Sequence, residues 1–225
     1  RSATVTAVPA AGLSTGDAIR VMQEEAANAL PPGHSFEWTG TAQQQLSSSG
    51  MVVVILGMAV LFTYLFLVAQ YESWTMPIAI LLSVVVAMFG AVVAVAMTGS
   101  DINLYTQIGM IMLIGMAAKN GILIVEFAME RRAAGLSIKE AAHEAGRQRF
   151  RAVMMTAFSF LLGVVPLLMA SGAGAASQQA IGVAVFGGML MATVVGVILI
   201  PVLYAFMQGL REWVKGSAKT VSPAE

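Results

Sequence analysis

The chain has 225 residues, of which 58% are apolar and 11% charged, against about 25% charged in an ordinary soluble domain. With zero formal net charge and no cysteine, this composition argues against a disordered chain, a soluble globular domain, a nucleic-acid partner, disulfides and thiolate metal sites. The sequence begins at Arg1 without a signal-peptide pattern, and we expect a segment of a longer protein.

Residues 1–48 are polar and mixed. Residues 2–8 alternate like a strand, residues 15–30 have the pattern of an amphipathic helix, and residues 34–39 predict a second strand. A β-α-β piece of this size cannot bury a core of its own. We therefore expect it to complete a sheet that lies elsewhere.

Five apolar stretches between residues 49 and 210 reach the length of about 20 residues that a membrane-crossing helix needs. They are too continuous for the alternating strands of a barrel. The predicted fold class is an all-α polytopic membrane protein with five transmembrane helices in a bundle. The expected spans are about 51–69, 76–98, 102–129, 152–170 and 180–207, with a surface helix at 130–150 and a polar tail at 211–225.

Lysine and arginine are distributed unequally about these spans. Under a five-span model, nine of them fall on the side of residues 130–150 and of the tail, and two, Arg1 and Arg20, on the other. Because cytoplasmic loops carry an excess of Lys and Arg, the C-terminus is predicted to be cytoplasmic and the N-terminal segment to lie outside.

Lys119 is the twelfth basic residue and lies inside the third span, about 15 Å from its cytoplasmic boundary. A lysine at that depth costs about 2.5–3.5 kcal/mol and is usually paired and functional. Glu126 shares its helix face but lies about 10 Å further along, too far for a direct pair. We therefore expect its partner carboxylate on a helix outside this chain. The alternative is a fixed ion pair that only holds two helices together.

Arg149 and Thr156 are seven residues apart, so a continuous helix places them on one face. Together they would line a hydrated path toward Lys119. Taken alone, each has a simpler interpretation, Arg149 as a topology anchor and Thr156 as a helix-packing hydroxyl.

Two other functional classes fit the sequence less well. Sixteen methionines are compatible with soft-metal transport, but scattered methionine is more often packing filler and no cysteine or histidine cluster supports it. An intramembrane hydrolase needs a nucleophile with a base or two acids inside the membrane, and both histidines, His34 and His143, lie outside the spans. We therefore predict no enzyme, no cofactor and no metal site.

Several collinear motifs carry a family resemblance. The run GMAAKNGILIVEFA at 115–128 resembles the tenth transmembrane helix of bacterial resistance-nodulation-division (RND) multidrug efflux transporters, in the hydrophobe/amphiphile branch. Four further runs resemble the same family in the same order: FEWTG at 36–40, YESW at 71–74, RFRAVMMT at 149–156 and SGAGAAS at 171–177.

This resemblance implies a proton-driven drug antiporter of the inner membrane. It also implies that the β-α-β piece at 1–48 is the end of a periplasmic α+β porter domain. In that family the lysine matching Lys119 pairs with two aspartates on the fourth helix, in the N-terminal half, and Arg149 and Thr156 match the relay residues of the eleventh helix. Asn120 and Glu126 are the supporting polar residues that we expect beside them. Two alternative hypotheses for the function remain. The chain is a non-transporting scaffold or oligomerisation module, or it belongs to an RND relative that exports metal ions or lipids.

The implied partners are the N-terminal half of the same transporter, two further copies in a homotrimer, a periplasmic adaptor and an outer-membrane channel. Small amphiphilic drugs are the implied substrates. All of these follow from the resemblance and not from composition or spacing.

Overall fold

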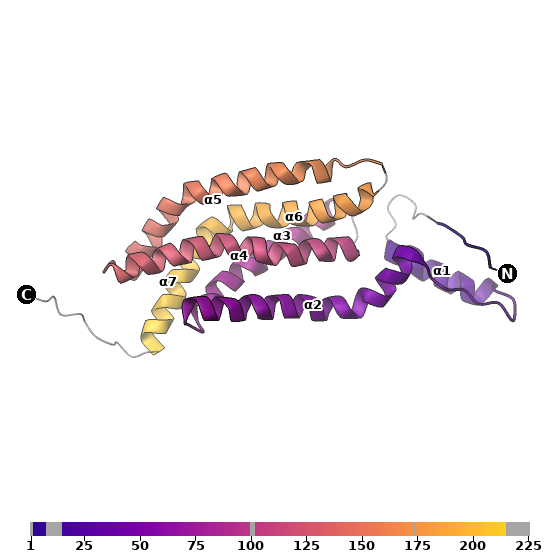
Figure 1. Ribbon diagram of the computed structural model, residues 1–225, viewed down its shortest axis with the longest axis horizontal. Helices are drawn as coiled ribbons and strands as arrows, with labels where there is room; N and C mark the ends of the chain where they lie inside the picture. Colours follow the sequence, from indigo (N-terminus) through magenta and orange to yellow (C-terminus); the bar gives the residue numbers. More distant parts are fainter. Residues whose placement is uncertain (1, 8–14, 100–101, 173, 215–225) are drawn as a thin grey trace, which may run out of the picture.

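The computed structural model describes residues 2–7, 15–99, 102–172 and 174–214. The helices within these residues are α1 (Thr15–Ala29), α2 (Gly40–Tyr71), α3 (Met76–Met97), α4 (Leu104–Ala133), α5 (Ile138–Leu168), α6 (Ala175–Val194) and α7 (Gly196–Val214). Figure 1 shows α2, α4, α5 and α6 running lengthwise, with α7 crossing at one end and α1 set apart at the other.

The N-terminal prediction is half wrong. The helix is present as α1, but neither predicted strand forms, since residues 2–7 and 34–39 have no secondary structure and residue 8 lies outside the described residues. A strand exists only where a neighbour accepts and donates its backbone hydrogen bonds, and the described part of the chain offers none. Phe36 and Trp38, two residues apart, still contact each other as neighbours on one face of a strand would. Their rings meet edge to face, with the ring centroids 5.6 Å apart.

Five helices are long and apolar enough to cross a membrane, which confirms the predicted number of spans. They are Gly50–Tyr71 of α2, α3, α4, α5 and α6. The last predicted span, 180–207, is divided between α6 and α7, which change direction near Val195 (Figure 1).

The polar stretch 130–150 is divided differently from the predicted surface helix. Helix α4 extends into this stretch as far as Ala133 and ends there in a Schellman motif. In this motif the Leu136 N–H donates to the Arg131 carbonyl at 3.3 Å, and Gly135 has a φ of 98°. A capping box of Ser137 and Glu140 then starts α5. Because α5 contains no proline before Pro166, it runs unbroken from these polar residues into the fourth span.

Helix α6 packs against α3, α4 and α5, and glycines allow this close approach. A Cβ on Gly187 would overlap Ala94 Cβ and lie 3.0 Å from the Gly90 carbonyl, and a Cβ on Gly188 would overlap Leu113. By contrast, only 6% of the residues in the apolar window of α2 are buried. Helix α6 is therefore closely packed inside the bundle, whereas most of α2 is exposed at its surface.

Candidate functional site

Lys119 lies at the centre of α4, about 21 Å from Ala133 by the helical rise. Its neighbours Ala117, Ala118 and Asn120 are buried, but Lys119 itself is exposed. Its ammonium makes no ion pair or hydrogen bond with any described residue. The chain therefore contains a mid-span cation that its own described side chains do not neutralise.

Lys119 belongs to a face of α4 that the bundle leaves open. Ile108, Met112, Gly115, Lys119 and Glu126 are all exposed and follow the spacing of one helix face. The opposite face packs inward: a Cβ on Gly121, for example, would lie 3.0 Å from Ile80 Cγ2 on α3. The open face is apolar apart from Lys119 and Glu126.

The two supporting residues behave differently. Asn120 is buried, and its Nδ2 has no hydrogen-bond partner among the described residues. Leaving a buried polar group unpaired costs about 1–3 kcal/mol. The Asn120 amide is thus a buried hydrogen-bond donor without an acceptor among the described residues, directly next to Lys119 in the chain. Glu126 is exposed, and no ion pair joins it to Lys119 within the described chain.

Arg149 is held against α4 by an aromatic ring. Its guanidinium carbon lies 4.8 Å from the centre of the Phe127 ring, and that of Arg131 lies at the same distance. Arg131 is also within 3.8 Å of a Glu144 carboxylate oxygen, whereas the buried Nε of Arg149 has no hydrogen-bond partner in the described part of the chain. The ring thus positions Arg149 at the start of the fourth span through a cation–π contact.

Helix α5 carries both Arg149 and Thr156, which were predicted to lie on a surface helix and on the fourth span, respectively. Thr156 is exposed, and its hydroxyl donates to the Val153 carbonyl at 3.0 Å. No hydrogen bond or ion pair joins Lys119, Arg149 and Thr156 within the described residues. The structure therefore brings Arg149 against α4 but leaves the three predicted relay residues unlinked.

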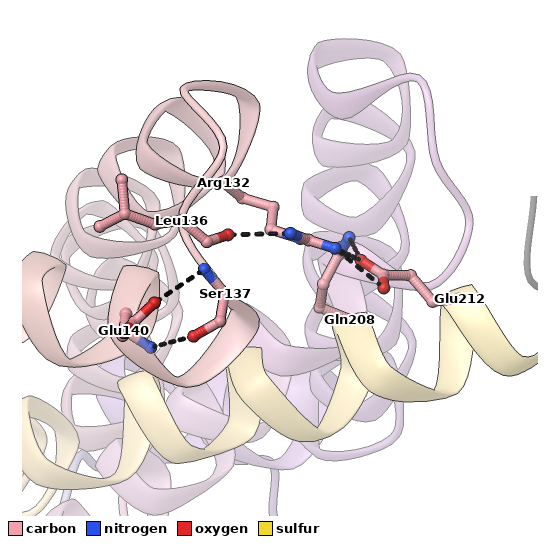
Figure 2. A network of polar contacts seen from close by, with 6 residues as sticks. All are labelled: Arg132, Leu136, Ser137, Glu140, Gln208 and Glu212. Carbon is pink, nitrogen blue, oxygen red and sulfur yellow. Dashed lines mark hydrogen bonds and ion pairs between the residues drawn. The ribbon is translucent and has the colours of Figure 1, made fainter. Parts of the chain in front are cut away.

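The sequence reasoning missed a polar network that ties α4 to α7 (Figure 2). Arg132 donates from Nε and Nη2 to the Glu212 carboxylate at 3.1 Å and from Nη1 to the Leu136 carbonyl at 2.8 Å, and Gln208 Nε2 donates to Glu212 at 2.8 Å. The hydrogen bond from Gln208, followed by those from Arg132, lowers the pKa of Glu212 below its usual 4.5. Eighty residues separate the two ionic partners, so no local pattern signals the contact.

The family model described as the AcrB/AcrD/AcrF family matches residues 1–208. The chain belongs to this family. It is 45% identical over 202 residues to the toluene efflux pump membrane transporter TtgB of Pseudomonas putida, and that match covers 90% of the chain and 19% of the relative. It is 40% identical over 202 residues to the multidrug resistance protein MdtF of Escherichia coli, covering 89% of the chain and 19% of the relative.

The chain thus spans about a fifth of the length of the curated relatives it matches. The resemblance to RND efflux transporters is confirmed. Together with the five apolar helices, this membership makes the chain part of a multi-pass inner-membrane protein.

Proposed function

We propose that this chain supplies the C-terminal part of the transmembrane proton relay in an inner-membrane multidrug efflux pump, which exchanges drugs for protons. The observation that carries the proposal is Lys119, an exposed mid-span ammonium with no partner among the described residues. The relatives TtgB and MdtF are named as a toluene efflux pump membrane transporter and a multidrug resistance protein, which supports transport rather than an enzymatic reaction.

The open face of α4 is where the missing partner would dock. An ion at the middle of a span is stabilised by pairing, and the described chain offers Lys119 no carboxylate. The family resemblance supplies two aspartates on the fourth helix of the N-terminal half. Packing that helix on the apolar stripe of α4 would cover Met112 and Gly115 and bring the aspartates to Lys119.

The mechanism we propose is an electrostatic switch. Charged aspartates hold the Lys119 ammonium, and protonation of the aspartates removes that attraction, so the lysine turns toward Thr156 and the neighbouring polar groups. A conformational change requires different contacts in its two states, and the made and broken ion pair provides them. The unpaired Asn120 amide and the Arg149 Nε are groups that gain partners in such a rearrangement.

We further propose that the N-terminal segment is periplasmic and that the C-terminus is cytoplasmic, because nine Lys and Arg residues lie on one side and two on the other. The working assembly would be a homotrimer with a periplasmic adaptor and an outer-membrane channel. Its substrates would be small amphiphilic drugs.

The decisive experiment replaces Lys119 in the full-length transporter that contains this chain. Purified Lys119→Met is reconstituted in proteoliposomes, and proton movement during drug efflux is followed with a pH-sensitive dye. We expect both proton movement and drug efflux to fall to the background of empty vesicles, because methionine keeps most of the length of the side chain and removes its charge.

The matched control is Lys139→Met, which removes an exposed lysine from the polar first turn of α5. It is expected to pump like the unaltered protein. Normal expression with full proton-coupled efflux in Lys119→Met would refute the relay, and efflux without proton movement in the unaltered protein would refute antiport.

A further inference from the structure

A groove of about 400 Å³ runs between the first third of α5 and the start of α7. Its floor forms where Gly146 meets Pro201, since a Cβ on Gly146 would lie 3.2 Å from the proline Cγ. Phe150 and Ile198 form apolar walls and remain exposed. The volume lies within the range of about 300–1,000 Å³ that is typical of ligand sites.

One rim of this groove is basic. Arg147 and His143 line it, are exposed, and make no ion pair or hydrogen bond within the described chain. The nearby acids are already engaged: Glu140 accepts from the Ser137 N–H, and Glu144 accepts from Gln148 and lies beside Arg131. The groove side chains that have no partner in the described chain are therefore basic, and their N–H groups favour an anionic occupant.

The groove lies where a helix changes from polar to apolar. Arg147 belongs to the polar first part of α5, whereas the residues from Ala152 to Ala170 form the apolar stretch predicted as the fourth span. On α7, Ile198, Val202 and Phe206 are exposed, as expected of side chains that face lipid. A ligand in the groove would thus have its polar end at the membrane surface and its apolar end against the hydrocarbon.

We propose that this groove binds an anionic phospholipid, with the headgroup phosphate held by Arg147 and His143 and one acyl chain packed on Phe150 and Ile198. The charge and the position both select this ligand. An apolar transmembrane helix in the same groove would cover these two donors without supplying acceptors, which is unfavourable. A zwitterionic phospholipid carries a compensating cation in its headgroup and offers less attraction to the basic rim.

The test uses the full-length transporter, freed of native lipid in detergent and titrated with phosphatidylglycerol or phosphatidylcholine of identical acyl chains. Bound lipid is counted by native mass spectrometry. We expect retention of phosphatidylglycerol over phosphatidylcholine. Arg147→Gln should weaken phosphatidylglycerol binding about fivefold, the factor expected for one basic residue near an anionic surface, and leave phosphatidylcholine binding unchanged.

Arg151→Gln is the matched control, because Arg151 is exposed one turn further along α5 and does not line the groove. It should leave phosphatidylglycerol binding within twofold of the unaltered protein. Phe150→Ala should weaken binding of both lipids, because it removes an acyl-chain contact and no charge.

Three outcomes would overturn the proposal. The first is equal retention of the two lipids by the unaltered protein. The second is equal weakening of phosphatidylglycerol binding by Arg147→Gln and Arg151→Gln, which would indicate a general surface charge effect. The third is displacement of the lipid by millimolar inorganic phosphate, which would indicate a simple anion site without an acyl-chain contact.

Discussion

Gly187→Ala tests whether the contact between α3 and α6 limits the stability of the bundle. The added methyl would overlap Ala94 Cβ and lie 3.0 Å from the Gly90 carbonyl, and both are parts of helix α3 that cannot rotate away. Overpacking costs about 1–3 kcal/mol, and alanine gains back about 1 kcal/mol of helix propensity over glycine. We expect a net loss of up to about 2 kcal/mol of folding free energy.

Gly163→Ala is the control, because a Cβ at this helical position of α5 meets nothing within 4 Å. It should gain up to about 1 kcal/mol from helix propensity alone. The assay heats the full-length transporter in detergent and measures the fraction that remains monodisperse by size-exclusion chromatography. The midpoint temperature should fall for Gly187→Ala and not for Gly163→Ala. Equal midpoints for the two variants would refute the steric argument.

The remaining predictions concern polar and aromatic contacts at the ends of the helices. The Glu212 pKa is lowered in the folded chain, so the stability this group contributes is present above its usual 4.5 and lost as pH falls through the lowered value. Because the Glu212 side chain is 40% exposed and solvent screens its ion pair, Glu212→Gln should remove at most about 1 kcal/mol at neutral pH. It should also reduce the loss of midpoint temperature on acidification, and an unchanged acid profile would contradict this. Phe127→Leu should cost about 0.5–2 kcal/mol by removing the ring under Arg149, measured by the same heating assay, and Phe127→Trp should restore it. Ser137→Ala should cost about 0.5–2 kcal/mol through loss of the capping box, seen as faster hydrogen exchange at the start of α5, and unchanged exchange there would refute the role of the cap.

The number of spans and the unusual position of Lys119 were predictable because both depend on local chemistry. About 20 apolar residues cross a bilayer as a helix in any context, and a lysine among them is costly wherever its helix packs. The capping box at Ser137 and Glu140 was predictable for the same reason, since its hydrogen bonds join residues three apart.

The N-terminal strands illustrate the opposite case. The alternation in residues 2–8 and 34–39 describes how side chains would face a sheet, but strand formation depends on a backbone partner that the pattern does not contain. Among the described residues there is no such partner, so residues 2–7 and 34–39 form no strand.

The contacts around the candidate site also lay beyond sequence reasoning. The Phe127 ring under Arg149 joins the consecutive helices α4 and α5, and the bond between Arg132 and Glu212 joins helices that are 80 residues apart at the point of contact. Their pairing depends on which faces of α4, α5 and α7 pack together, and hydropathy does not specify rotation about a helix axis when a span is apolar on all sides.

The sequence by itself determined a polytopic helical membrane protein with five spans and an ionisable residue at mid-depth, because helix formation and hydrophobic length are local properties. The tertiary structure decided which face of α4 stays open at Lys119, how closely α3 and α6 approach at Gly90 and Gly187, and where α7 meets α5. These features arise from the fit of side chains between helices, and only the packed bundle specifies that fit.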